Sequence, residues 1–137
     1  MEITAISSST THSAAIAAGV GFLIVAGFQV GLALGAPWGR AAWGGSHEGR
    51  LPRNLRIASG FAAVFWVLAA SVLFGRAGYE PVALPSTLAR WGTWVLFGLS
   101  VLGALVNLAS RSRLERLIWS PASGILAALC LVVALSG

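Results

Sequence analysis

The chain has 137 residues, of which 57% are hydrophobic and only 9% are charged. A soluble domain carries about a quarter charged residues, so the composition excludes a water-soluble globule. The single cysteine, Cys130, excludes a disulfide framework and a paired-cysteine redox site. The net charge of +5 comes from nine arginines that lie in short loops beside apolar stretches, so membrane lipid, and not nucleic acid, is the expected anionic partner.

Four uncharged stretches follow one another along the chain, at residues 14–36, 57–75, 91–110 and 117–137. As helices they would each span about 28 to 35 Å, and the hydrocarbon core of a bilayer is about 30 Å thick. The sequence therefore predicts an all-α fold, a single-domain integral membrane four-helix bundle with helices at about 14–36, 55–75, 89–110 and 113–136. The segment before the first helix has no basic residue and the helix is longer than a signal-peptide core, so we expect it to be retained.

The arginines indicate an orientation. Seven of the nine lie in the first and third connections, and short arginine-rich loops stay on the cytoplasmic side. We therefore expect both termini to be extracytoplasmic. The lysine-free, Ala/Gly-rich usage is typical of a GC-rich bacterial genome, which suggests the bacterial plasma membrane.

The first helix carries glycines at successive four-residue steps, Gly27, Gly31 and Gly35, and should end before Pro37. Such spacing permits close backbone approach between helices in lipid, so this face is predicted to be a helix-packing interface. A contact within the bundle is the favoured interpretation. A homo-oligomer or a membrane-protein partner is the alternative.

The first connection is rich in glycine and tryptophan and is a candidate site for lipid head groups. Tryptophans at helix ends suit the membrane interface, and arginines beside the Gly44-Gly45 backbone suit an anion. An acid/base pair of His47 with Glu48 is disfavoured, because neighbouring residues on an irregular loop have no defined mutual geometry. The candidate residues are Trp38, Arg40, Trp43, His47, Glu48, Arg50 and Arg53.

Few polar residues lie inside the predicted helices. Gln29, Ser59 and Asn107 are expected at similar depth near the cytoplasmic end, and a buried amide needs a partner or a hydrated cavity. With Arg56 and Arg111 nearby in the sequence, and Glu115 also close, they form a candidate polar pocket that opens to the cytoplasm. The alternative is that the amides only make hydrogen bonds between helices.

The start of the fourth helix has the capping-box spacing Ser112-x-x-Glu115. Pro121 then falls about two turns into that helix and should kink it. Alternatively, Ser120 caps a new helix with Pro121 at its first position, after a short interfacial turn at residues 114–119.

No predicted span contains Asp, Glu, Lys, Arg or His within its uncharged stretch, which argues against a proton-coupled carrier, a haem-binding bundle or an intramembrane protease. We expect no catalytic residue, no cofactor and no metal site. The favoured function is that of a structural or accessory membrane protein that binds a membrane partner, a copy of itself or lipid. The alternative is an oligomeric channel or carrier for a small neutral or anionic solute, and an enzyme acting on lipid head groups comes third.

Several short motifs give the chain a resemblance. They are the run Gly35-Ala36-Pro37-Trp38-Gly39, the pairs Gly44-Gly45, Leu51-Pro52 and Leu55-Arg56, and the segment 107–121 with Asn107, Ser110, Ser112, Glu115-Arg116, Trp119 and Pro121. With these the chain resembles a group of small four-span, actinobacterial-like membrane proteins to which no activity is attached. The resemblance implies membrane architecture, and it draws attention to the first connection and the start of the fourth helix.

Overall fold

A computed structural model describes residues 5–79 and 84–137, and within these ranges the chain is helical and has no strand. Four segments are long and apolar enough to cross a membrane: α1 (Ser8–Ala33), α2 (Arg53–Arg76), α3 (Ser86–Leu108), and the run Glu115–Leu135, made of η4 (Glu115–Trp119) and α4 (Ser120–Leu135). The predicted all-helical, four-helix architecture is confirmed. Residues 1–4 of the N-terminal segment lie outside the described ranges.

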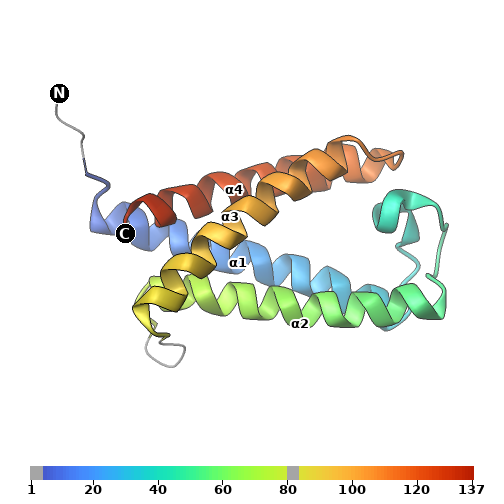
Figure 1. The fold of residues 1–137 in the computed structure, drawn as a ribbon. Helices are drawn as coiled ribbons and strands as arrows, with labels where there is room; N and C mark the ends of the chain where they lie inside the picture. Colours follow the sequence, from blue (N-terminus) through green and yellow to red (C-terminus); the bar gives the residue numbers. More distant parts are fainter. Residues whose placement is uncertain (1–4, 80–83) are drawn as a thin grey trace.

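Consecutive helices run in opposite directions (Figure 1). α1 packs mainly on α2, and α3 packs mainly on α4. α3 begins beside the end of α2 and crosses the bundle to finish beside the start of the fourth helix, so α2 and α3 diverge toward the end opposite the chain termini (Figure 1). Loop one, residues 34–52, lies at that end and contains the short helices η1 (Gly39–Ala41) and η2 (Trp43–Gly45).

Local signals explain the boundaries of α1. The Ser7 side chain accepts a hydrogen bond from the Thr10 amide at 3.2 Å, so α1 begins at Ser8, earlier than the predicted residue 14. α1 ends at Ala33 because Gly35 adopts a φ of +99°, and the amide of Ala36 donates to the Gly31 carbonyl at 2.9 Å. This pattern is the Schellman motif, in which glycine provides the left-handed residue. Gly35 therefore terminates the helix.

The densest packing lies in the half of the bundle that holds the termini. Small residues of α1, such as Ala15 and Ala18, are fully buried against α2 and α4, as lipid-soluble helices require for close approach. A Cβ atom on Gly19 would lie 2.8 Å from the Phe74 ring, and one on Gly21 would lie 2.6 Å from a methyl group of Leu126. The close helix contacts of α1 are therefore made at Gly19 and Gly21.

The predicted glycine interface differs from this arrangement. No atom lies within 4 Å of a Cβ placed on Gly27, and Gly31 faces the indole of Trp38 in loop one. Gly35 lies beyond the helix. Within the chain these three glycines therefore contact loop one or open space, and not another helix. The four-residue spacing alone does not distinguish a glycine that packs against a helix from one that ends a helix or contacts a loop.

The fourth helix starts after Ser112, as the capping box predicts. The Ser112 hydroxyl accepts a hydrogen bond from the Glu115 amide at 3.2 Å. Pro121 is accommodated by a π-helical turn, η4, in which the Ser120 amide donates to the Glu115 carbonyl five residues earlier. Ser120 itself has helical dihedrals, so the helix continues through Pro121 and Ser120 does not cap a separate one.

Candidate functional site

A cavity of about 430 Å³ lies inside the bundle at the loop-one end. Its walls come mainly from α1, α3 and the fourth helix, with one residue, Trp66, from α2, and loop one covers it. This volume is in the range of small-molecule sites in proteins. The lining residues are Phe22, Val25, Phe28, Gln29, Ala41, Ala42, Trp43, Gly44, Trp66, Leu99, Ser100, Gly103, Val106, Asn107, Glu115, Trp119, Ser123 and Leu126.

The polarity of the cavity changes with depth. Glu115 begins the fourth span, Asn107 lies in the last turn of α3, and Gln29 lies about 6 Å before the end of α1. The lining face of the fourth helix runs about 15 Å from Glu115 to Leu126, which is about half the thickness of a bilayer core. At that depth the walls are Phe22 and Trp66, whose rings stack at 5.4 Å. The carboxylate and both amides therefore lie at the loop end of the cavity, among aromatic rings, and the deep end is mainly aromatic and aliphatic.

The structure brings together two members of the predicted polar pocket. Gln29 and Asn107 line the same cavity, but no hydrogen bond joins them. The Gln29 Oε1 atom is buried and has no hydrogen-bond partner within the described residues. Ser100, on the same face of α3 as Asn107 and two turns deeper, is only 4% exposed, and its hydroxyl also has no partner there. Both are buried polar groups of side chains that line the cavity.

The other predicted members of the pocket have different positions. Ser59 is fully buried and accepts a hydrogen bond from the Trp43 indole at 3.0 Å, so it holds a wall of the cavity without lining it. Arg56 donates to the Ala33 carbonyl at 3.1 Å and so satisfies the end of α1. Arg111 is exposed and does not line the cavity. These arginines are part of the loop-end surface and not of the pocket.

Glu115 lines the cavity and is only 7% exposed. The Ser112-x-x-Glu115 spacing predicts a capping role, and it does not show that the side chain also faces the cavity. Its carboxylate accepts a hydrogen bond from the Ser110 hydroxyl at 3.0 Å, and the Ser112 amide also donates to that hydroxyl at 3.0 Å. The reciprocal half of the capping box therefore passes through Ser110. In the described part of the chain, no basic group lies within ion-pair distance of Glu115.

Loop one is fixed over the cavity by several contacts. The Gly39 amide donates to the Gly49 carbonyl at 2.8 Å, and the Ser112 hydroxyl donates to the Arg40 carbonyl, which joins the loop to the fourth helix. Beneath the loop, Ala42 and Leu51 pack on Leu32. Trp43 has a φ of +50°, a left-handed conformation that costs a non-glycine residue about 1–2 kcal/mol. In this conformation the Trp43 side chain lines the cavity and its indole donates to Ser59.

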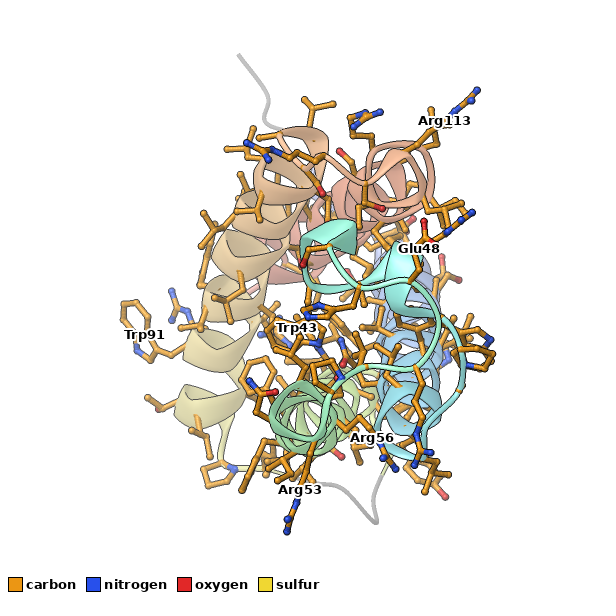
Figure 2. All side chains as sticks on the ribbon, turned by 90° about the vertical axis from the view of Figure 1, so that its right-hand side faces the viewer. Trp43, Glu48, Arg53, Arg56, Trp91 and Arg113 are labelled. Atoms are coloured by element: carbon orange, nitrogen blue, oxygen red, sulfur yellow. The ribbon has the colours of Figure 1, made fainter. Side chains whose placement is uncertain are left out.

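The candidate head-group residues of loop one do not converge on a single site. The Glu48 carboxylate pairs with Arg40 at 3.0 Å on the exposed surface, and His47 contacts Ser46 at 3.3 Å, so no His47–Glu48 acid/base pair forms. Trp38 stacks on Phe28, with ring centroids 5.6 Å apart. Viewed from the loop-one end, Trp43 lies in the middle of the ring of helices, whereas Arg53 points away from it (Figure 2). Arg50 and Arg53 are exposed.

The polar groups of the cavity are few and separate from one another. One carboxylate, two amides and isolated hydroxyls line an otherwise apolar cavity, and no group of three metal-ligating side chains occurs among residues 5–79 and 84–137. Sequence reasoning missed Ser100, although its seven-residue spacing from Asn107 places both on one helix face. No family model, curated protein or solved structure matches the chain.

Proposed function

We propose that this chain is a multi-pass protein of the bacterial plasma membrane that binds a small amphiphilic molecule in the cavity beneath loop one, without acting on it chemically. The observation that carries the proposal is the polarity gradient. Gln29, Asn107 and Glu115 lie at the loop end, while Phe22, Trp66 and Leu126 lie at the depth of the bilayer centre. An amphiphile aligned with the membrane normal matches this gradient, since its head and tail meet groups of their own kind.

The orientation belongs to the same proposal. Seven of the nine arginines lie at the loop-one end of the bundle, and Arg53 and Arg113 point outward there (Figure 2). Two are in loop one, two in the first turn of α2, and three around the start of the fourth helix, namely Arg40, Arg50, Arg53, Arg56, Arg111, Arg113 and Arg116. The positive-inside rule assigns that end to the cytoplasm and the termini to the outside. The polar end of the cavity then lies near the cytoplasmic leaflet, and membrane lipid is the nearest source of ligand.

A carrier for a small neutral solute is the second candidate, because Gln29, Ser100 and Asn107 line one cavity. An anionic solute is disfavoured, since the Glu115 carboxylate lines the same space. A pore through a single copy is also disfavoured. Beyond Phe22 and Leu126 the bundle is filled by the core cluster that contains Cys130 and Val133.

Two glycines of α3 provide a matched test. Gly103 lines the cavity, and a Cβ there would lie 3.5 Å from the Ser123 hydroxyl, so Gly103→Leu extends into the cavity. Gly98 is exposed, and a Cβ there meets nothing within 4 Å, so Gly98→Leu places the same side chain outside the bundle. Purified full-length protein in phosphatidylcholine nanodiscs is labelled with an eight-carbon alcohol that carries a diazirine, and the labelled peptides are mapped by mass spectrometry.

The expected result is saturable labelling of cavity-lining segments of α3 and the fourth helix in the wild type and in G98L. G103L should label clearly more weakly than either at every probe concentration, because the leucine side chain takes up part of the space that the probe needs. Equal labelling of all three proteins, or labelling only on outward faces, would overturn the proposal. Far-ultraviolet circular dichroism of each variant establishes that the helices are intact.

A further inference from the structure

We infer that the ligand of this cavity carries a protonated amine on an apolar body, and that Glu115 is the group that binds the amine. This inference rests on the proposed function and gives the ligand its chemical class. Four features of the cavity carry it. Among the described residues, they are a buried carboxylate without a counter-ion, polar groups without partners, aromatic rings at the same end, and nearby arginines that do not line the cavity.

The carboxylate is the first feature. Glu115 is 7% exposed, and the Ser110 hydroxyl at 3.0 Å is the one side-chain donor that contacts it within the described residues. A carboxylate has about four acceptor positions, and burying its charge in apolar surroundings is costly unless an opposite charge is supplied. Because Glu115 lines the cavity, a ligand can supply that charge.

The arginines around the start of the fourth helix do not neutralise the Glu115 carboxylate. Arg111, Arg113 and Arg116 are all exposed, and Arg116 donates to the Ser110 carbonyl at 2.7 Å. Arg113 points away from the bundle (Figure 2). The one ion pair found in residues 5–79 and 84–137 joins Arg40 to Glu48 on the surface. The cavity therefore presents a negative group to its contents although the chain as a whole is positive.

The remaining polar groups suit an ammonium. The Gln29 side chain lines the same cavity, and its buried amide oxygen has no partner within the described residues, so this oxygen is an unused acceptor in the cavity wall. The Ser100 hydroxyl, in a side chain that is 96% buried, is also without a partner and lines the cavity deeper down. A protonated amine has up to three N–H donors, and the cavity offers a carboxylate and an amide oxygen as acceptors. An amine therefore suits these groups better than an anionic or a purely apolar ligand.

Aromatic rings complete the polar end. Trp119 lies one turn after Glu115 on the same face of the fourth helix, and its ring centroid is 4.8 Å from that of Phe28. Trp43 covers the cavity from loop one. The faces of such rings attract cations, most strongly where water is excluded. The apolar remainder of the ligand then extends toward Phe22 and Leu126.

Two sources provide this chemistry, an aminophospholipid head group and a free lipophilic amine. The test uses three diazirine probes with the same eight-carbon chain, an amine, an alcohol and a carboxylate, on full-length protein in nanodiscs of phosphatidylcholine. The labelling of cavity peptides is measured against probe concentration. Phosphatidylethanolamine is then added to the nanodiscs as a competitor for the amine probe. Competition indicates the lipid head group, and its absence indicates the free amine.

The wild type should bind the amine at least about tenfold more tightly than the alcohol, the ratio expected of a charge-assisted hydrogen bond, and the carboxylate least tightly. Glu115→Gln should bring the amine and the alcohol within about threefold. Glu48→Gln is the matched control, because it removes an exposed carboxylate from loop one, and it should keep the wild-type order.

Equal binding of the amine and the alcohol by the wild type would overturn the inference, and that result needs no variant. If G103L still blocks both probes in that case, the cavity binds amphiphiles and only the amine assignment fails. If G103L leaves all labelling unchanged, the proposed function fails instead. Preference for the alcohol over the amine would also overturn the inference.

Discussion

Gly39 is a position where one methyl group should loosen loop one. A Cβ on Gly39 would overlap the carbonyl of His47 and lie 2.7 Å from the carbonyl of Gly49. Both are backbone atoms, so rotamer changes cannot relieve the overlap. Overpacking of this kind costs about 1–3 kcal/mol. The displaced loop also loses the 2.8 Å hydrogen bond from Gly39 to Gly49, which contributes about 1 kcal/mol more.

We therefore expect Gly39→Ala to stabilise the open form of loop one by about 2–4 kcal/mol relative to the closed form, or about 30- to 700-fold in population. Hydrogen exchange measured by mass spectrometry reports this population directly. The hydrogen-bonded amides between Gly39 and Gly45 that report it are those of Gly39, Ala41, Ala42 and Gly45. Their exchange should accelerate by that factor while exchange in α2 stays unchanged.

Gly98→Ala is the control for adding a methyl group, because a Cβ at Gly98 has open space and helical alanine is favoured over glycine by about 1 kcal/mol. It should leave loop-one exchange unchanged. If G39A exchanges at the wild-type rate in loop one, the loop is not held against its own backbone as described. The assignment of loop one as the cover of the cavity would then be wrong.

Three further predictions concern the same end of the bundle and its orientation. Ser112→Ala removes the cap of the Glu115 amide and the bond to the Arg40 carbonyl, so loop-one amides should exchange about tenfold faster or more, whereas Ser9→Ala should have no such effect. Trp43→Phe removes the indole donor to the buried Ser59 and should lower stability to denaturant by about 1–3 kcal/mol, and unchanged stability would contradict that bond. A reporter that is active only in the cytoplasm should be inactive when fused after Gly137, and activity there would reverse the proposed orientation.

Much of the fold follows from the sequence because membrane-spanning helices need long uncharged stretches, and few other sequences have four of them. Capping at Ser112 is equally local, since it depends on residues three apart. The predicted start of α1 at residue 14 is wrong because it depends on the uncharged stretch that follows His12, whereas Ser7 already caps the helix. The boundary of an uncharged stretch indicates where lipid can begin, whereas a capping residue indicates where the helix itself begins.

The site was predictable only in part. Gln29 and Asn107 were expected to face inward on solvation grounds, and they line the cavity. The roles of Ser59 and Arg56 depend on how loop one and the end of α1 fold back on the bundle, which no residue spacing encodes. Glu115 lies at the boundary of an uncharged stretch, so its placement inside the cavity depends on the tilt of α3 against the fourth helix. Such placements are tertiary and do not follow from periodicity.

The π-helical turn before Pro121 fixes which way Glu115 faces. This turn holds one residue more than an ordinary α turn, and the Ser120 amide reaches back five positions to the Glu115 carbonyl. Regular α winding over the same residues would rotate everything upstream of the turn by about 100° around the helix axis, because four residues instead of five would complete the turn. Deleting a single residue within the turn, for instance Leu117, would leave an ordinary α turn between Glu115 and Ser120, so the Glu115 side chain would keep its direction and the shortened helix would still hold it toward the cavity.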